Sequence, residues 1–483
     1  MSENIKSLTL KGLFWNALDR VGFQLVTTLV GIITARILLE SDFAVIGVLS
    51  IFSVVATSIV DSGLATSLVR SKVVEDKDYS SMFVFNLIVS GFLYLALFIT
   101  APYIERFYAI DGLALYARTL FLQLLINAFG IVQYVKVLKR GQFNITARVN
   151  VLAVILSGGI AVTLALTEFG VWTLIVQPVL YTTFRTSMFW IWGDWKVDFS
   201  YSAASIRKHM KFSLFFMVTN LLGKILSPLY VNVVGKYYDA VQTGHYFQAN
   251  RWGETPNLLI SSIVQGTTLS TLAPIQDDYV RFLNACRKAF STLAFVLFPV
   301  SMLAISIAYP GFMWALTDKY ENAVVYFQLL CAAGIFISFT DMNVNFINIK
   351  GKSRYALILE IIKLTSAGIV LFFTVEYGIL TIIYGQFFVR VLCYIVSVYW
   401  SRKVYGYNLA LQIRDLAPYF LNSITAAFLS YLPLYFSVVN SYLVMLIIQS
   451  VLFLSVYIVL NHIFKNPIWV EGIQMIKVKI KKA

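Results

Sequence analysis

Apolar stretches of about 20 residues recur along this chain from Leu13 almost to the C-terminus, and each is long enough to cross a hydrocarbon core of about 30 Å as a helix. Barrel strands would instead alternate apolar and polar residues. Composition agrees, because 59% of the 483 residues are hydrophobic and 13% are charged, whereas soluble domains are about 45–50% apolar. The sequence therefore predicts an all-α polytopic membrane protein.

Fourteen transmembrane helices can be placed, and the eighth is the most polar of them. It carries Gln248, Asn250, Arg251, Glu254 and Gln265, so we expect neighbouring helices or water to shield it from lipid. The predicted spans are 12–35, 43–61, 82–100, 113–135, 149–166, 171–192, 211–234, 244–270, 289–308, 324–345, 356–375, 378–400, 416–436 and 442–463.

Lysine and arginine set the expected orientation, because short cytoplasmic loops collect these residues. Of the 38 in the chain, 27 fall in the termini and alternate loops if Lys211, the first residue of the seventh span, is counted with its loop. Seven fall deeper inside spans, and four fall on the other side: Arg36, Arg106, Lys236 and Lys319. Both termini are therefore predicted to be cytoplasmic. The net charge of +14 reflects this topology and contact with anionic membrane lipids, and no nucleic acid is expected as a partner.

The sequence does not predict a cleaved signal peptide, a metal site or a cofactor site. The first span carries Asp19 and Arg20 and lacks a small-residue cleavage site, which indicates a retained span rather than a removed signal peptide. The three cysteines and three histidines show no paired spacing, so we predict no disulfide framework, no metal site and no cofactor.

Catalysis is not expected of this chain either. The intervals between predicted spans, including the inner loop near 193–210, are all shorter than a folded domain of roughly 50 residues. A glycosyltransferase or polymerase would need a substantial extramembrane loop with acidic residues. The sequence also lacks a GxxxxGK[ST] phosphate loop, so ATP hydrolysis is not expected. Transport, channel formation and scaffolding remain.

One short motif occurs twice. EFGVWTLI at 168–175 and EYGILTII at 376–383 are 208 residues and six predicted spans apart. We interpret each as an outer turn whose glycine caps the end of the preceding helix. Two other pairs follow a similar offset: LKRGQF at 138–143 with IKGKSRY at 349–355, and ARILLESDFAVIG at 35–47 with GKYYDAVQTGHYF at 235–247.

Because six is an even number, the two halves would share one orientation. This is the parallel-repeat architecture of two-lobed secondary transporters, in which the substrate site lies between the lobes and opens alternately to each side. We therefore predict a six-helix lobe at 1–195, a second six-helix lobe at 196–405, and helices 13 and 14 with a basic cytoplasmic tail at 406–483.

Cations inside the spans are the candidate substrate-binding residues. Arg390, Lys224 and Arg185 lie about 18–21 Å from the boundary where their helices begin, which is too deep for easy contact with headgroups. Arg251, Arg118 and Arg20 lie nearer a boundary, where side chains can snorkel to the interface. We predict that the first three line a cavity and that the other three are secondary candidates.

Acidic residues are fewer in the spans, and they can pair or carry coupling ions. Glu360 with Lys363 and Glu254 with Arg251 are i,i+3 neighbours on one helix face. Asp19, Glu254 and Glu360 are the candidates for proton or sodium coupling. The excess of cations predicts an electropositive cavity, which suits an anionic passenger such as a pyrophosphate.

Several segments, in this order along the chain, resemble the polysaccharide transporter family of the MOP (MATE-like) superfamily, which includes the Wzx-type O-antigen and exopolysaccharide flippases. They are ARILLESDFAVIG, DSGLATSLV (61–69), LKRGQF, EFGVWTL, QTGHYF (242–247), STLAPIQDD (270–278), the Phe298-Pro299 step and NIKGKSRY (348–355).

This resemblance implies a flippase in the bacterial inner membrane that moves a polyprenyl-pyrophosphate-linked oligosaccharide from the inner to the outer leaflet. Cavity cations would engage the pyrophosphate or acidic sugars. A glycan polymerase and the chain-length machinery are the implied protein partners. Two alternatives stay open, a cation-coupled multidrug exporter of the same superfamily and a non-transporting scaffold of a glycan assembly complex.

Overall fold

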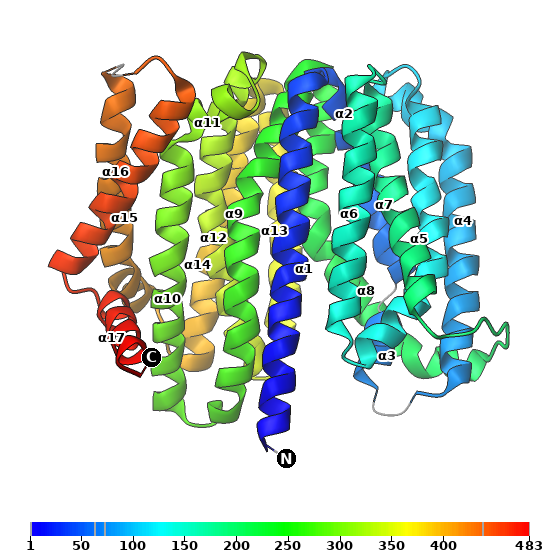
Figure 1. Cartoon of the computed structure of the whole chain (residues 1–483), viewed down its shortest axis with the longest axis horizontal. Coiled ribbons are helices and arrows are strands. Elements are labelled where there is room, and N and C mark those ends of the chain that lie inside the picture. The colour runs from blue at the N-terminus through cyan, green and yellow to red at the C-terminus, as the bar shows by residue number, and fades with distance from the viewer. Residues whose placement is uncertain (1, 62–63, 72–73, 437–438, 483) are drawn as a thin grey trace. The chain divides into compact units, whose positions relative to one another are not determined.

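The computed structural model describes residues 2–61, 64–71, 74–436 and 439–482, and all regular secondary structure in these residues is helical (Figure 1). Fourteen helices of 21 residues or more follow the order of the fourteen predicted spans. They are α1 (Ser2–Ile37), α2 (Glu40–Asp61), α4 (Asp76–Tyr108), α5 (Leu113–Lys139), α6 (Phe143–Leu166), α7 (Val171–Trp192), α8 (Ala203–Tyr237), α9 (Ala240–Leu272), α10 (Tyr279–Ser306), α12 (Glu321–Ile349), α13 (Arg354–Thr374), α14 (Ile379–Tyr405), α15 (Leu409–Tyr435) and α16 (Tyr442–Ile463).

Shorter helices connect or extend these long ones. They are α3 (Leu64–Arg70), α11 (Ala308–Ala315) and α17 (Pro467–Lys482), with the 3-10 turns η1 (Ala273–Ile275), η2 (Asp318–Tyr320) and η3 (Val375–Tyr377). The basic tail predicted at the C-terminus falls on α17, but Lys477, Lys479, Lys481 and Lys482 lie outside the residues whose side chains are described.

Eleven helical stretches of the described residues are long and apolar enough to cross a membrane. The long helices outside this set are α7, α9 and α15, which carry more polar residues. In α9 the structure buries Gln248 and Asn250, as expected for polar residues that must be kept from lipid; Gln265 lies outside the described side chains. The described residues therefore contain a long helix at each of the fourteen predicted positions. Eleven of these helices contain a stretch long and apolar enough to cross a membrane.

The chain divides into two compact units, Met1–Gly244 and His245–Ala483. The first unit contains α1 to α8, and the second contains nearly all of α9 and every later helix. This boundary groups α8 with the first unit. The division into lobes 1–195 and 196–405 with a helix pair at 406–483 remains a prediction.

Within the first unit, α1 packs on α6, α4 on α5, α5 and α6 on α7, and α2 on α8. Small residues permit the closest of these contacts. A Cβ atom on Gly158 of α6 would lie 2.6 Å from a methyl of Val30 on α1, so this approach requires glycine. In the second unit α12 packs on α14, α10 on α15, and α15 on α16.

The repeated EFG and EYG motifs both place a glycine directly before a helix. Gly170 is the N-cap of α7 with a φ of 53°, and Gly378 is the N-cap of α14 with a φ of 100°. These positive φ values favour glycine. The helix C-cap role predicted for Gly170 was wrong, because α6 ends at Leu166 with Thr167 as its C-cap. Gly378 is also the C-cap of the 3-10 turn η3.

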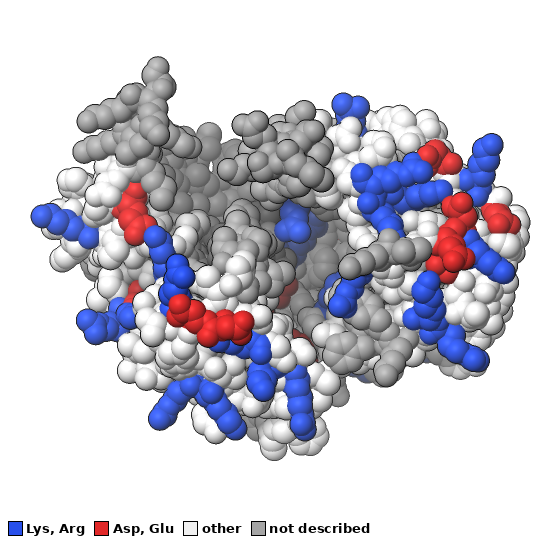
Figure 2. Space-filling view, turned by 90° about the horizontal axis from the view of Figure 1, so that it is seen from below, with Lys and Arg blue, Asp and Glu red and all other residues white. Residues whose placement is uncertain are grey.

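The segment between α7 and α8 folds back on the first unit. Trp195 is buried, and its carbonyl accepts a 2.7 Å hydrogen bond from Nε2 of Gln133. Asp194 is paired with Arg140, and this hydrogen bond lowers the pKa of the Asp194 carboxyl. Figure 2 views the end of the molecule at which α1 begins, where Lys and Arg side chains are prominent.

Candidate functional site

A cavity of about 880 Å³ opens within the first unit, and three of the predicted substrate-binding cations line it. They are Arg20 from α1, Arg185 from α7 and Lys224 from α8. The other lining residues are Thr57, Ser58, Asp61, Ala65, Thr66, Gln123, Asn127, Ile131, Tyr134, Tyr181, Thr182, Met217 and Asn220. Six helices of one unit, α1, α2, α3, α5, α7 and α8, therefore converge on one basic, mixed polar cavity, which we call the basic cavity.

Arg185 is held by two asparagines. Its Nε donates to Oδ1 of Asn150 at 3.1 Å, and its Nη1 donates to Oδ1 of Asn127 at 3.5 Å. Its guanidinium also lies over two aromatic rings, with its carbon 4.9 Å from the centroid of Tyr134 and 5.2 Å from that of Phe189. Amide contacts on the edge and rings on the faces fix the plane of the guanidinium.

Each of the two asparagines is in turn held by a carboxylate. Nδ2 of Asn150 donates to both carboxylate oxygens of Asp19 at 3.1 Å, and Nδ2 of Asn127 donates to Oδ1 of Asp61 at 3.3 Å. The assignment of amide oxygen and nitrogen follows from this network. The result is a continuous chain from Asp19 through Asn150, Arg185 and Asn127 to Asp61.

The charge of Arg185 is therefore stabilised without a direct ion pair. Among the described residues, no carboxylate lies within 4.0 Å of the charged atoms of Arg185, Arg20 or Lys224, although Asp19 and Asp61 interact with Arg185 electrostatically at longer range. The lining set holds three cations and the carboxylate of Asp61, so its formal charge is +2, or +1 if Asp19 behind the wall is included. The basic cavity can thus receive an anion.

Other predicted cations of the spans lie elsewhere. Arg118 on α5 donates to the Phe98 carbonyl at 3.2 Å and lies 4.2 Å from the Phe98 ring centroid, so it is bound to α4 rather than facing the basic cavity. Arg251 belongs to the second unit, where its guanidinium carbon lies 5.6 Å from the Trp252 ring centroid.

Arg390, also in the second unit, is buried in an ion pair. Its Nη2 lies 3.2 Å from Oε1 of Glu254, and its Nη1 donates to the Leu330 carbonyl at 3.2 Å. The side chain of Arg390 is only 6% exposed. This geometry ties α14 to α9 and to α12.

The predicted contact between Glu360 and Lys363 is confirmed. Oε2 of Glu360 lies 2.6 Å from Nζ of Lys363, one turn apart on α13. This pair explains how both charges are tolerated in an apolar helix. A role for Asp19, Glu254 or Glu360 in ion coupling remains a prediction.

Sequence reasoning missed the two asparagines that hold Arg185. Asn127 and Asn150 fall inside predicted spans, and a buried amide in a membrane helix needs a partner just as a charge does. That signal was available from the sequence. The partner of each asparagine was not, because Asn150 and Asp19 are 131 residues apart.

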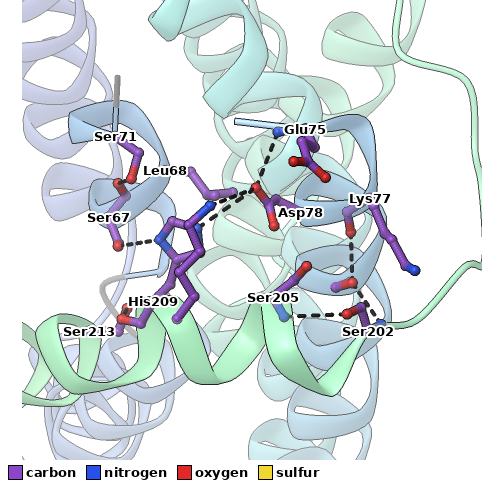
Figure 3. A network of polar contacts seen from close by, with 12 residues as sticks. Ser67, Leu68, Ser71, Glu75, Lys77, Asp78, Ser202, Ser205, His209 and Ser213 are labelled. Atoms are coloured by element: carbon purple, nitrogen blue, oxygen red, sulfur yellow. Dashed lines mark hydrogen bonds and ion pairs between the residues drawn. The ribbon is translucent and has the colours of Figure 1, made fainter. Parts of the chain in front are cut away.

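A second polar cluster joins the start of α8 to α3 and α4 (Figure 3). Oγ of Ser67 and Nδ1 of His209 are 2.8 Å apart, and Nε2 of His209 lies 4.0 Å from Oδ2 of Asp78. Nζ of Lys208 approaches the same oxygen at 3.7 Å. Burial lowers the pKa of His209, which precedes the predicted span 211–234. We call Ser67, Asp78 and His209 the α8 anchor.

Long apolar helices surrounding a basic cavity define the class of this chain as a polytopic membrane protein with a solute-sized site. The model of the polysaccharide biosynthesis protein family matches residues 33–325, and the chain belongs to that family. This confirms the resemblance that the sequence motifs indicate.

Curated relatives are similar over about two thirds of the chain or more. The succinoglycan biosynthesis transport protein ExoT of Rhizobium meliloti is 25% identical over 66% of this chain and 65% of its own length. The teichuronic acid biosynthesis protein TuaB of Bacillus subtilis is 22% identical over 78% of both chains. The lipopolysaccharide biosynthesis protein WzxC of Escherichia coli is 22% identical over 69% of this chain and 68% of its own.

Solved structures share the fold. The inward closed conformation of the lipid II flippase MurJ matches with a TM-score of 0.76 and 16% identity, covering 94% of this chain and 99% of that one. An inward-facing multidrug transporter of the MATE family matches with a TM-score of 0.65 and 19% identity over 80% and 95%. The chain is thus a multi-pass membrane protein of the polysaccharide biosynthesis protein family that shares the fold of these flippase and multidrug transporter structures.

Proposed function

We propose that this protein is a Wzx-type flippase, which moves a polyprenyl-pyrophosphate-linked oligosaccharide from the inner to the outer leaflet of the bacterial inner membrane by alternating access. The main observation behind this proposal is the basic cavity. Arg20, Arg185 and Lys224 line it, in a member of the polysaccharide biosynthesis protein family. Guanidinium groups bind phosphate oxygens in pairs, and an ammonium adds a point charge.

The preorganisation of Arg185 supports an anionic passenger. Its plane is fixed by Asn127, Asn150 and the ring of Tyr134, while no direct ion pair neutralises it among the described residues. A guanidinium fixed in advance loses less conformational entropy when it binds an anion. We propose Arg185, Arg20 and Lys224 as the pyrophosphate ligands; Arg118, Arg251 and Arg390 are weaker candidates because they are engaged elsewhere.

Orientation and architecture follow the same proposal. Both termini would face the cytoplasm, as the distribution of lysine and arginine predicts. The glycine N-caps at Gly170 and Gly378 support two parallel six-helix lobes, with α15 and α16 as the added pair. Asp19 is the preferred candidate for ion coupling, because Asn150 links it directly to Arg185.

We propose the chemical class of the passenger, a lipid-linked pyrophosphate, and not the identity of its glycan. The relatives are named for succinoglycan, teichuronic acid and lipopolysaccharide, so the glycan differs among them and the family does not fix the glycan of this chain. A glycan polymerase and the chain-length machinery are the proposed protein partners.

A cation-coupled drug exporter is the main alternative, since MATE transporters share the fold. A cavity with three cations and a formal charge of +2 disfavours a cationic passenger.

Deletion of the gene, with and without a plasmid copy, tests the proposal. The null strain should accumulate the polyprenyl-linked repeat unit on the inner leaflet and lose the surface glycan, and the plasmid copy should restore it. Normal surface glycan in the null strain would contradict the flippase proposal, while lost glycan together with unimpaired flipping would favour the scaffold.

A further inference from the structure

An apolar groove of about 600 Å³ lies between α2, α4 and α8, apart from the residues that line the basic cavity. Its walls are aliphatic and aromatic side chains, among them Phe52, Ala96, Leu97 and Val233. Lys236 is the charged residue among the described residues that line it. Since all three helices belong to the first unit, the groove is complete within that unit.

The groove is long enough to cover the hydrocarbon of one leaflet. On α4 its lining runs from Leu93 to Phe107, which is roughly 21 Å at about 1.5 Å per residue, and one leaflet contributes about 15 Å of hydrocarbon. It thus extends from the middle of the helices to the end where α4 and α8 finish. Tyr108 and Tyr237 lie at that end, where tyrosine is favoured in membrane proteins.

A cation stands at the same end. Nζ of Lys236 donates to the Phe107 carbonyl and lies 4.2 Å from the centroid of the Phe107 ring. An ammonium has three N–H donors. Among the described residues, Lys236 donates one hydrogen bond, to the Phe107 carbonyl, so further donors remain for a ligand. The Tyr108 hydroxyl donates to Oδ1 of Asn232 at 2.6 Å, and this hydrogen bond joins α4 to α8 one helical turn before Lys236.

We propose that this groove binds one acyl chain of an anionic phospholipid, with its headgroup phosphate on Lys236. An apolar channel one leaflet deep with a cation at its mouth matches an amphiphile of that form. One ammonium suits the single charge of a phosphodiester; a pyrophosphate would call for several cations or a guanidinium fork. If the predicted orientation holds, the lipid is in the outer leaflet.

The site is tested on full-length protein reconstituted in vesicles of equal parts phosphatidylglycerol and phosphatidylcholine, extracted gently and weighed by native mass spectrometry. The protein should retain phosphatidylglycerol in preference to phosphatidylcholine. Lys236→Gln should lower that retention about threefold, the size of one partly exposed charge pair, and Lys236→Arg should preserve it. This measurement needs no transport, so its failure would leave the flippase proposal untouched.

A matched pair of groove variants tests the acyl chain. Ala96→Trp fills the groove and should reduce the retained phosphatidylglycerol, while Leu95→Trp, on the 56% exposed neighbouring position, should not. If Ala96→Trp does not fold, Lys236→Gln decides alone. Equal retention of the two lipids, unchanged retention in both Lys236→Gln and Ala96→Trp, or a polyprenyl carrier as the species bound after extraction from native membranes would each overturn the proposal.

Discussion

Nε of Arg185 donates a 3.1 Å hydrogen bond to Oδ1 of Asn150, and the amide of Asn150 donates in turn to Asp19. A neutral amide thus stands between the cation and the carboxylate. The amide orients Arg185 and keeps its charge available, which a direct ion pair would not do. Several consequences of this arrangement can be measured.

Removal of the Arg185 side chain should weaken transport. Arg185→Ala should lower export of the surface glycan in a complemented null strain about tenfold or more, because a charge-assisted hydrogen bond contributes about 1.5–3 kcal/mol. Arg118→Ala is the matched control, since Arg118 also lies in a span but contacts Phe98 instead of the basic cavity. Equal losses in both variants at equal protein levels would contradict a specific role for Arg185.

Replacement of the amide by a carboxylate should quench the same cation. Asn150→Asp places a negative charge against Nε of Arg185 and beside Asp19, so we expect impaired export with the protein still inserted. Asn144→Asp, at the start of the same helix, serves as the control and should export normally. Wild-type export by Asn150→Asp would show that the charge of Arg185 need not stay free.

The pair of Arg390 and Glu254 should contribute to stability. Arg390→Ala removes the cation of this pair, and breaking a buried pair in this way costs about 3–5 kcal/mol. The expected result is a lower unfolding temperature of the purified protein in detergent. The double variant Arg390→Met with Glu254→Gln should recover part of that loss, because no uncompensated charge remains. A stable Arg390→Ala protein that has lost only transport would instead assign Arg390 to substrate binding.

Acidification should loosen the α8 anchor. Burial lowers the pKa of His209 below its unfolded value of about 6.5, so the unfolded chain binds the proton more readily than the folded one. Between the lowered pKa and about 6.5, stability therefore rises with pH and is lost as pH falls. Asp78 opposes this effect, while Lys208 and Lys139 add to it.

Thermal unfolding between pH 7.5 and 5 measures the contribution of His209. His209→Gln should flatten the pH dependence, and His462→Gln, exposed at the end of α16, should leave it as in the wild type. An unchanged slope in His209→Gln would exclude this histidine as the responsible group.

Much of the fold could be predicted because hydrophobic length is a strong signal. The predicted span 356–375 became α13, Arg354–Thr374, whereas 82–100 fell short of α4, Asp76–Tyr108. Helices extend beyond the hydrocarbon into water, where hydropathy no longer marks them. The short α3 and α11 were missed because seven or eight residues carry too little periodicity.

The depth of a cation along its predicted helix identified candidate site residues. It could not show which side chains surround each cation. Helix depth selected Arg185 and Lys224, which line the basic cavity, and also Arg390, which lies in an ion pair. Depth cannot separate these cases, because the partners of each cation lie on other helices, as Asn150 does for Arg185 and Glu254 does for Arg390. Arg20 was ranked lower by depth, yet it faces the basic cavity.

The central claim is that the basic cavity carries the anionic group of a lipid-linked glycan across the membrane. Purified protein in proteoliposomes, given a fluorescent polyprenyl-pyrophosphate-linked glycan, allows the fraction that reaches the opposite leaflet to be measured by enzymatic access. We expect rapid flipping by the wild type and by Arg118→Ala, and background flipping by the triple variant Arg20→Ala, Arg185→Ala, Lys224→Ala. Wild-type flipping by a folded triple variant would contradict this claim.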